Sequence, residues 1–361
     1  MNIAIITFSD FNTNYGSILQ AFALKTFLES EGHSVTFIKY REFNSSSTKF
    51  SINQIRSILI KAYYWIYRSE KKRRTYNFKQ FIDEYLKHTR LYTSEEDLEQ
   101  NLESFDAYIC GSDQIWNIEC LGGFREPYFL KFADSSKLKI AYAPSMGDYI
   151  PTADITYKIS CLLKSFNAIS TREKRSSQLV SEIFGKTVPT VVDPTLLLNR
   201  SQWIETVGSN KPSIDGEYAV CYFVRRHPLA EKMVSYFKKK YSIPIYNLSD
   251  NHIHVRGTKN DYITSSPSDF VNLIANAKFC IGTSFHLAAF STIFDKHCYI
   301  IKTGHNESRI KEIFTLVGRV DHMTSGDFDK LPDTKSMIDY TKYDTHVNMS
   351  KDFLRSSLSV V

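Results

Sequence analysis

The first forty residues constrain the fold most, because they hold two strand patterns with one helix pattern between them. The apolar run IAIITF at 3–8 is typical of a strand that is buried on both faces. Apolar residues then recur at helical spacing in ILQAFALKTFLESEG at 18–32, where Gly32 can end the helix. The run HSVTFIKY at 33–40 is a second strand pattern. This order predicts a β-α-β unit and therefore a parallel sheet.

The same alternation of strand and helix patterns continues through the rest of the chain. Strand-like runs recur as FDAYICG, KIAYAPSM, AISTRE, TVVDPTLLL, YAVCYFV, IPIYNL, FCIGTSF and CYIIKTG. Helical patterns separate several of them, among them KRSSQLVSEIFG and SDFVNLIANAK. A chain of 361 residues also exceeds the size at which one core usually stops growing. We therefore predict an α/β fold of two doubly wound Rossmann-like domains that face each other across a cleft.

The expected domain limits follow from where these patterns change. The first domain covers residues 1–165 and holds a helical insertion at about 41–105, a stretch with few strand signals and many charged and aromatic residues. The second domain covers residues 166–335. A helical tail at 336–361 follows, and it can pack back on the first domain.

Charge and cysteine content narrow the class of protein. The formal net charge of +6 favours anionic ligands or an anionic surface, and we expect no nucleic-acid partner. The six cysteines are scattered without a C-x-x-C pair, which indicates reduced thiols and neither a metal site nor a disulfide framework. The start of the chain has no basic leader, and the sequence holds no apolar run long enough to span a membrane. We expect a cytoplasmic protein.

One segment of the insertion is both basic and aromatic. The run KAYYWIYRSEKKRRTYNFKQF at 61–81 has one acid, Glu70, in its middle among many basic side chains. It is either a surface helix with solvated charges or a patch that touches the headgroups of an anionic membrane. The second interpretation predicts peripheral contact with the inner face of the membrane.

Ligands of open parallel sheets bind beyond the carboxyl ends of the strands, so the residues that follow the strands are the candidates for a site. After the first strand, the amides at the start of a helix favour an anion or a hydroxyl-rich ligand. The candidates there are Asn14, Tyr15, Gly16 and Ser17. The segment matches neither the P-loop nor the G-x-G-x-x-G pattern, so nucleotide binding has no support from a motif.

The run YICGSDQIWN at 108–117 ends another strand in polar residues. Gly111 lets the backbone turn sharply, and Ser112 and Asp113 can cap a helix or contact a ligand. Trp116 is either a stacking surface for a ligand or a wedge in the core.

Two charged residues follow strand patterns in the middle of the chain. Arg172, in NAISTREKRS, suits bidentate contact with a carboxylate or phosphate, but it can equally pair with Glu173 or Asp193. Asp193 precedes a proline in VVDPT, where an aspartate is usually a turn former.

The segment FCIGTSFHLAAFSTIF at 279–294 is the most informative. An apolar strand gives way to polar residues that include Ser284, and His286 then opens an apolar helix. A histidine there can hold or donate a proton near neutral pH. Arg309, in GHNESRIKEIF, is a second anion contact or a solvated charge.

Taken in order, several segments resemble the polysaccharide pyruvyl transferase family. They are NYGSILQAFAL, YICGSDQIWN, ISTREKRSSQLV, VVDPTLLL, SPSDFVNLIANAKFCIGTSFHLAAFS and SRIKEIFTLVGR. The resemblance runs from about residue 1 to residue 320 and leaves 41–105 as a variable insertion. It implies a fold similar to that of B-type glycosyltransferases, with the donor site in the second domain.

The resemblance also implies a reaction, the transfer of pyruvate from phosphoenolpyruvate onto sugar hydroxyls as a ketal. The family's donor-gripping arginine and histidine correspond to Arg172 and His286. In that chemistry His286 protonates C3 of the donor and Arg172 holds its carboxylate or phosphate, without a metal or another cofactor. The acceptor is a glycan, which the family commonly meets on a lipid diphosphate. Many members have arginine where this chain has Ser284, and glycine where it has Leu287.

Two alternatives stay open at this point. A B-type glycosyltransferase with a nucleotide-sugar donor would need an acidic pair about eight residues apart, which Glu307 and Glu312 do not supply. A non-catalytic relative that keeps the cleft for sugar binding would fit the absence of arginine at position 284.

Overall fold

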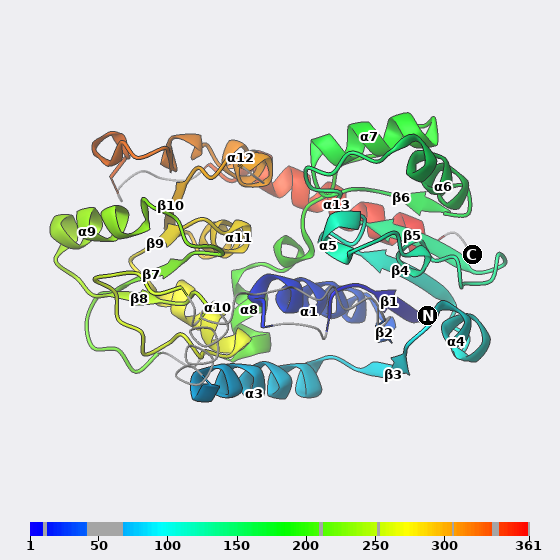
Figure 1. The fold of residues 1–361 in the computed structure, drawn as a ribbon, viewed down its shortest axis with the longest axis horizontal. Helices are drawn as coiled ribbons and strands as arrows, with labels where there is room; N and C mark the ends of the chain where they lie inside the picture. The colour runs from blue at the N-terminus through cyan, green and yellow to red at the C-terminus, as the bar shows by residue number, and fades with distance from the viewer. Residues whose placement is uncertain are drawn as a thin grey trace, which may run out of the picture.

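The computed structural model has two parallel sheets, each covered by helices (Figure 1). It describes residues 1–9, 13–41, 68–208, 212–250, 253–304, 307–333 and 339–359. Within this part of the chain, every pairing between neighbouring strands is parallel. The two parallel sheets confirm the predicted fold class.

The first sheet has the strand order of a Rossmann fold. Its described strands lie in the order β3-β2-β1-β4-β5-β6. They are β1 (Asn2–Ile6), β2 (Ser34–Tyr40), β3 (His88–Tyr92), β4 (Ala107–Gly111), β5 (Leu138–Tyr142) and β6 (Ala168–Ile169). The order reverses between β1 and β4, and the loops that leave these two strands therefore diverge and open a crevice.

The second sheet has the other common doubly wound order. Its described strands lie in the order β11-β10-β9-β7-β8. They are β7 (Ala219–Tyr222), β8 (Ile245–Asn247), β9 (Phe279–Gly282), β10 (His297–Ile301) and β11 (Met323–Thr324). Read from the first strand, this is the flavodoxin-like order, and it reverses between β7 and β9. Each half of the molecule thus has one crevice at its sheet.

Helices cover both sheets and connect the strands (Figure 1). The first half carries α1 (Tyr15–Ser30), α3 (Arg68–Tyr85), α4 (Glu95–Asn101), α5 (Ile118–Leu121), α6 (Ala153–Leu163) and α7 (Lys174–Phe184). The later chain carries α8 (Arg200–Val207), α9 (Ala230–Tyr241), α10 (Pro267–Asn276), α11 (Phe285–Ile293), α12 (Glu307–Leu316) and α13 (Thr341–Leu358). Short 3₁₀ helices lie at Glu126–Phe129, Pro194–Leu197, Val320–His322 and Phe328–Lys330.

One continuous apolar core joins the two halves, and it includes residues of β1, α1, α8, α10 and α11. The ring of Tyr15 stacks on Phe270 of the other half at a centroid distance of 4.2 Å. Trp203 lies between Phe22 and Phe290, at 5.6 and 4.9 Å. Separate cores lie on the far sides of the two sheets. These aromatic contacts pack α1 of the first half against α8, α10 and α11, and they form an apolar seam between the halves.

Helix α3 adds hydrogen bonds to this apolar contact between the two halves. It runs along one edge of the molecule, beneath both α1 and α10 (Figure 1). Arg74 is 2% exposed and donates to the backbone oxygens of Ile263 (2.6 Å) and Thr13 (3.1 Å). Asn77 donates to the oxygen of Thr264 at 2.6 Å. The predicted solvated basic face is therefore wrong for Arg74, because tertiary packing buries this side chain between the halves.

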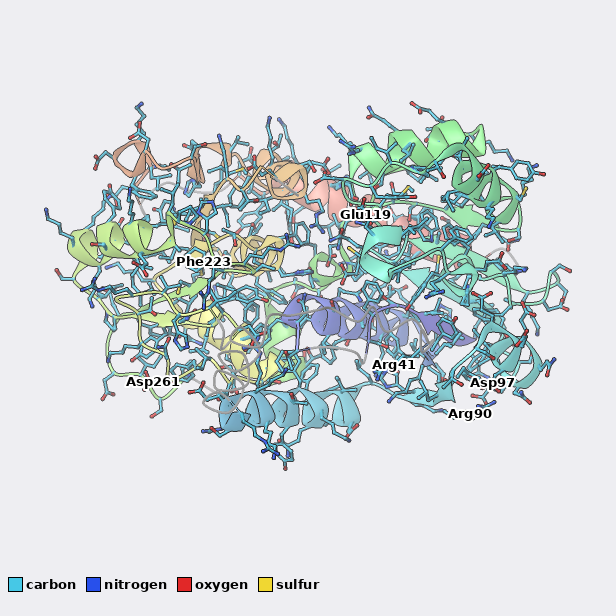
Figure 2. All side chains as sticks on the ribbon, in the orientation of Figure 1. Arg41, Arg90, Asp97, Glu119, Phe223 and Asp261 are labelled. Carbon is cyan, nitrogen blue, oxygen red and sulfur yellow. The ribbon has the colours of Figure 1, made fainter. Side chains whose placement is uncertain are left out.

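Other details differ from the sequence expectation. The insertion contributes an edge strand, β3, and the Arg90–Asp97 ion pair joins it to α4 (Figure 2). The strand-like run at 190–198 forms an isolated bridge and then the 3₁₀ helix Pro194–Leu197, because the Asp-Pro step turns the chain. Residues 61–67 of the basic aromatic run lie outside the described residues.

The end of the chain contacts the first half. Helix α13 passes from α12 to β5 (Figure 1). Arg355 pairs with Glu31 at 2.8 Å, and the ring of Phe353 lies 6.3 Å from that of Tyr142. The predicted domain limits stay a prediction, and β6 extends the first sheet slightly beyond residue 165. In the described ranges, no helix has the length and apolar character that crossing a membrane requires.

Candidate active site

A pocket of about 330 Å³ lies where the carboxyl ends of the two sheets meet. The first half contributes residues after β1 and β4, and the second half contributes residues after β7, β9 and β10. The lining is Asn14, Asp113, Gln114, Tyr222, Val224, Arg225, Arg226, His227, Thr283, Ser284, Phe285, His286, Thr303, Arg309 and Ile310. The pocket thus joins the crevices at the two points of strand-order reversal, which is where doubly wound sheets bind ligands.

His286 is held in this pocket from both halves. It lies in the first turn of α11, whose N-cap Ser284 accepts a hydrogen bond from the amide of Leu287. Its ring packs on Gly16 of α1, where an added Cβ would lie 2.0 Å from Nδ1. Only glycine leaves room for the ring at that position. About 12% of the side chain is exposed, yet Nε2 is buried and has no hydrogen-bond partner among the described residues.

Asp193 lies behind the pocket and binds residues from several loops. Its Oδ1 accepts from the amide (3.0 Å) and hydroxyl (2.8 Å) of Thr195. Its Oδ2 accepts from Ser112 Oγ (3.1 Å) and Arg172 Nη1 (2.9 Å). The same oxygen lies 3.9 Å from His286 Nε2. Burial raises the pKa of Asp193, but His286 and Arg172 outweigh it, and the net shift is downward. Asp193 is therefore a carboxylate at neutral pH.

The charges around His286 decide its protonation. Burial lowers its pKa, Asp193 and Asp113 raise it, and Arg172 and Arg309 lower it further. The net shift is downward from 6.5, so the ring is neutral at neutral pH when the pocket holds no anion. An anionic ligand would raise the pKa and bring the ring closer to protonation.

Arg172 lies deeper than the sequence suggested. Its side chain is 2% exposed and is not part of the pocket lining. Besides the bond to Asp193, Nε lies 3.6 Å from Glu173 Oε2 and Nη2 lies 4.0 Å from Asp113 Oδ1. Neither Nε nor Nη2 has a hydrogen-bond partner among the described residues. The pairing with Asp193 that the sequence left open is present, and contact with a donor stays a prediction.

Arg309 is the predicted cation that does line the pocket. It projects from α12 over the ring of Phe285 at 5.6 Å, and Arg172 lies 5.2 Å from the same ring. Burial and then the nearby Arg172 lower its pKa. Its buried Nε has no hydrogen-bond partner in the described ranges. A half-buried guanidinium with a donor to spare is suited to an anion.

The sequence analysis missed several lining residues, three of which form one run. Arg225, Arg226 and His227 begin three positions after the end of β7, and all three line the pocket. A signal existed, because the run RRH comes straight after the strand pattern YAVCYFV. The cationic side of the pocket therefore comes from the second half, through Arg225, Arg226 and Arg309.

The remaining polar candidates lie at or beside the pocket. Asn14 caps α1 by accepting from the amide of Gly16 at 2.9 Å, and it lines the pocket. Ser17 donates to Asp113 Oδ2 at 2.7 Å, so it orients a lining carboxylate. The backbone of Asp113 has a φ of 66°, a left-handed conformation that is strained for a residue other than glycine.

Three further candidates lie outside the pocket lining, in addition to Gly16, Ser17, Ser112 and Arg172. Tyr15 is buried in the seam, where its hydroxyl donates to the oxygen of Ser265 at 3.0 Å. An added Cβ at Gly111 would lie 2.9 Å from Leu24, so this glycine serves helix packing. Trp116 stacks on Phe129 at 5.1 Å and is 1% exposed. The interpretation of Trp116 as a wedge in the core matches its place, and the stacking surface does not.

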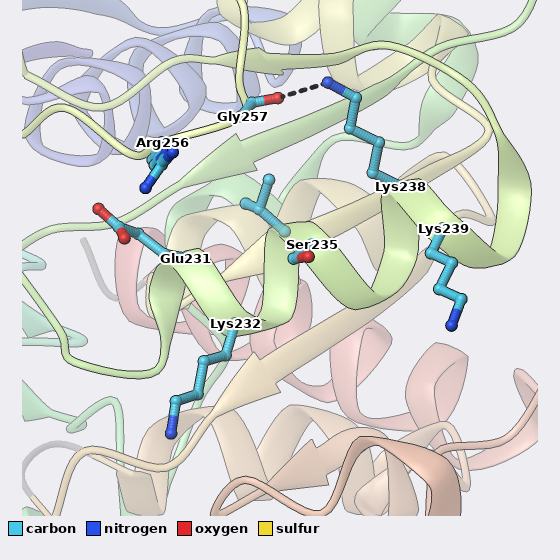
Figure 3. Close-up of a pocket in the computed structure, with 8 residues that line it drawn as sticks. Glu231, Lys232, Ser235, Lys238, Lys239, Arg256 and Gly257 are labelled. Carbon is cyan, nitrogen blue, oxygen red and sulfur yellow. Dashed lines mark hydrogen bonds between the residues drawn. The ribbon is translucent and has the colours of Figure 1, made fainter.

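A larger depression, of about 750 Å³, lies on α9 (Figure 3). It is lined by Glu231, Lys232, Val234, Ser235, Lys238, Lys239, Arg256 and Gly257. These residues come from the second half alone, and Lys238 already donates to the oxygen of Gly257 at 3.3 Å. Size is a weaker criterion than converging buried polar groups, so the interdomain pocket is the better candidate. In the described ranges, no cluster of His, Cys, Asp and Glu could hold a metal ion.

Comparisons with known proteins bear on family and fold. A family model described as polysaccharide pyruvyl transferase matches residues 14–305. The curated proteins gave no match. Among solved structures, UDP-GlcNAc 2-epimerase from Methanocaldococcus jannaschii is similar with a TM-score of 0.54 and 10% identity, over 99% of both chains. The epimerase from Rickettsia bellii is similar with a TM-score of 0.51 and 12% identity, over 99% of this chain and 96% of that one. At such identities the likeness concerns the fold alone.

Proposed function

The chain belongs to the polysaccharide pyruvyl transferase family, and we propose that it moves pyruvate from phosphoenolpyruvate onto two hydroxyls of a sugar, as a ketal. The acceptor in this proposal is a precursor of a cell-surface polysaccharide. The observation that carries it is the interdomain pocket itself, which brings His286 together with a group of arginines. A proton source beside fixed cations is what the reaction needs.

The cations suit the donor's charge. Phosphoenolpyruvate carries a carboxylate and a phosphate, and guanidinium groups bind both as planar, charge-assisted partners. Arg309, Arg225 and Arg226 line the pocket, with Arg172 behind it. These arginines supply the positive charge that relatives with arginine at position 284 obtain there. Ser284 therefore does not argue against this donor.

The proposed reaction has two additions at one carbon. His286 gives a proton to C3 of the donor, and C2 becomes an oxocarbenium-like centre that the first sugar hydroxyl attacks. The C2–O bond to phosphate then breaks, the second hydroxyl adds to C2, and the ketal is complete. Of the two hydroxyl protons, one replaces the proton that His286 gave and the other leaves with phosphate. The donor's negative charge raises the pKa of His286 as it binds, so the acid is charged when it is needed.

The two alternatives have less support. A nucleotide-sugar transferase of this architecture would use an acidic pair, and Asp113 is the carboxylate in the pocket lining of the described residues. Glu307 and Glu312 do not belong to that lining. A non-catalytic sugar-binding protein would have no need of a buried histidine beside converging arginines.

Thermal unfolding with candidate donors tests the proposal, because a ligand that binds the folded state raises the melting temperature. We expect phosphoenolpyruvate to raise it and UDP-GlcNAc to leave it unchanged. Arg309→Met should abolish the increase, whereas Arg309→Lys, which keeps the charge, should retain part of it. Transfer is then followed by mass spectrometry and phosphate release, with p-nitrophenyl glycosides of gluco, galacto and manno configuration as acceptors. Stabilisation by UDP-GlcNAc alone would favour a glycosyltransferase function. Binding of phosphoenolpyruvate without transfer to any acceptor would favour a non-catalytic sugar-binding protein.

We further propose that α3 brings the protein to an anionic membrane, where a lipid-linked acceptor would lie. Its outward face forms a groove of about 530 Å³ lined by Arg68, Lys71, Lys72, Thr75, Tyr76 and Lys79. Tyr76 is 59% exposed among these basic side chains. Basic residues with an interfacial aromatic ring are suited to reversible contact with anionic headgroups.

A further inference from the structure

The pocket places two conflicting demands on its charges. Arginines must be present to hold an anionic donor, but the same arginines oppose protonation of the acid. Arg172 and Arg309 both disfavour the imidazolium form of His286. A site with these cations therefore needs a fixed negative charge near the histidine, placed where it does not repel the donor.

We propose that Asp193 is a positioning residue that supplies this charge, so that His286 carries its proton beside the arginines. The proposal rests on the function proposed above and deepens it. Asp193 does not touch the substrate in this account. It acts through His286 and Arg172, which it holds in one arrangement.

The bonds of Asp193 support a role by charge. A carboxylate has about four lone-pair positions, and Asp193 accepts two hydrogen bonds from Thr195, one from Ser112 and one from Arg172. The side chain is thus fixed in place and has no position left for another donor. His286 Nε2 lies 3.9 Å away, which is beyond hydrogen-bond distance. The carboxylate therefore attracts the protonated ring by charge and does not accept a hydrogen bond from Nε2.

The location of Asp193 separates it from the other carboxylate near His286. Asp113 lines the pocket and would face an incoming anion. Asp193 is fully buried and lines a small cavity of about 30 Å³ behind the pocket, together with Arg172 and Arg309. It can stabilise the imidazolium from the rear with little repulsion of the donor. Four charged groups act on His286. Asp193 and Asp113 favour its protonated form, and Arg172 and Arg309 disfavour it.

The first test follows the protonation of His286 itself, without substrate. NMR titration of the histidine ring nitrogens in the whole chain, with the Asp193→Asn variant beside the native protein, should show that His286 takes up its proton at a lower pH in the variant. Ser112→Ala is the matched control, because it removes a neutral hydrogen bond to the same oxygen and keeps the charge. It should leave the titration unchanged, and Asp193→Glu should restore it in part. An unchanged titration in Asp193→Asn overturns the proposal.

Loss of the buried charge can also prevent folding, so a second measurement uses the native chain alone. The ¹³Cγ signal of Asp193 should stay that of a carboxylate and should shift when His286 titrates. If that signal is insensitive to the histidine, the proposal fails regardless of any variant.

Turnover separates this inference from the function on which it rests. At neutral pH, Asp193→Asn should reduce kcat about tenfold for each unit by which the pKa of His286 falls, with a smaller change in KM for phosphoenolpyruvate. The fall of kcat with rising pH should begin at a lower pH than in the native enzyme. If the native protein transfers no pyruvate, the proposed function fails while the titration still decides the role of Asp193. If it transfers pyruvate and the variant has the same pH profile, only this inference fails.

Discussion

Arg74 and Arg172 are both buried where the two halves meet, yet their surroundings differ. Arg74 donates to the backbone oxygens of Ile263 and Thr13 and lies over the ring of Tyr15 at 4.5 Å. Arg172 faces the carboxylates of Asp193, Glu173 and Asp113. Backbone oxygens and aromatic rings do not titrate near neutral pH, whereas the interaction of carboxylates with an arginine depends on neighbouring protons and ligands. Arg74 therefore stabilises the contact between the halves. Arg172 belongs to the group of interacting charges around His286.

The same contrast holds for the two regions as a whole. The seam around α3, α1 and α10 is made of stacked rings and bonds to the backbone. In and behind the pocket, His286, Arg172 and Arg309 have buried nitrogens without a hydrogen-bond partner among the described residues. Substitutions in the seam should lower the stability of the fold and leave the chemistry intact. Substitutions in the pocket should lower turnover and leave the stability of the fold nearly unchanged.

Among these substitutions, one at His286 in the pocket should give the largest loss of turnover with the least loss of stability. Replacing it with Gln removes the proposed acid, and turnover should fall by about 10²-fold or more, the usual contribution of such a group. Affinity for phosphoenolpyruvate and the melting temperature should change little. His227→Gln is the control, since this partly buried histidine lines the same pocket without the contacts of His286. Normal turnover of the His286→Gln enzyme at saturating acceptor would assign the acid to another residue.

Arg74→Met tests the opposite side of the comparison. It leaves two buried backbone oxygens without their partner and removes a cation from an aromatic ring, so the free energy of unfolding should fall by about 3 kcal/mol. Chemical denaturation measures this change. The variant that still folds should keep the native pH profile of transfer. A shifted pH profile, or unchanged stability, would show that Arg74 does not have the structural role described above.

The pH dependence sharpens the assignment of His286. Its pKa in the folded chain lies below 6.5, chiefly because burial disfavours the charged ring. A required proton on His286 means that kcat/KM falls as the pH rises through this lowered pKa. Bound donor raises the pKa, so kcat should persist to a higher pH, because kcat reports the complex and kcat/KM the free enzyme. Initial rates between about pH 5 and 8 test this order of the two pH values. A kcat that falls at a lower pH than kcat/KM would contradict it.

The smallest effect is expected on the outward face of α3, whose inner face holds Arg74. Changing Lys71, Lys72 and Arg73 to Gln should alter stability by less than about 0.5 kcal/mol, because all three side chains are exposed. It should reduce sedimentation with vesicles that contain anionic lipid, as added salt should in the native protein. Equal binding to neutral vesicles would leave this face as solvated charges only.

The regular alternation of strands and helices made the fold predictable. Apolar runs such as 3–8 and 279–282 became buried parallel strands, and the residues after β1, β4 and β9 met in one pocket as the rule for open sheets predicts. His286 and Asp113 were found this way. Position after a strand was enough to identify them.

The burial of other residues depended on contacts between distant segments. Arg74 is 189 positions from its partner Ile263, and nothing in its basic surroundings indicates that packing. The sequence left Asp193 as a turn former, and it does accept from the amide of Thr195, but its bonds to Ser112 and Arg172 arise only from the fold. The sequence around Trp116 fits both of its interpretations, because an aromatic ring after a strand can stack on a ligand or pack in the core.

A crystal structure with phosphoenolpyruvate bound tests the central claim most directly. The account predicts the donor in the interdomain pocket, with an oxygen of its phosphate or carboxylate about 3 Å from the guanidinium of Arg309, a hydrogen-bond distance. Its C3 should face the His286 ring, and Arg172 should lie behind the donor and contribute positive charge. A donor bound elsewhere, more than about 8 Å from both His286 and Arg172 and so beyond any direct contact, would contradict the account.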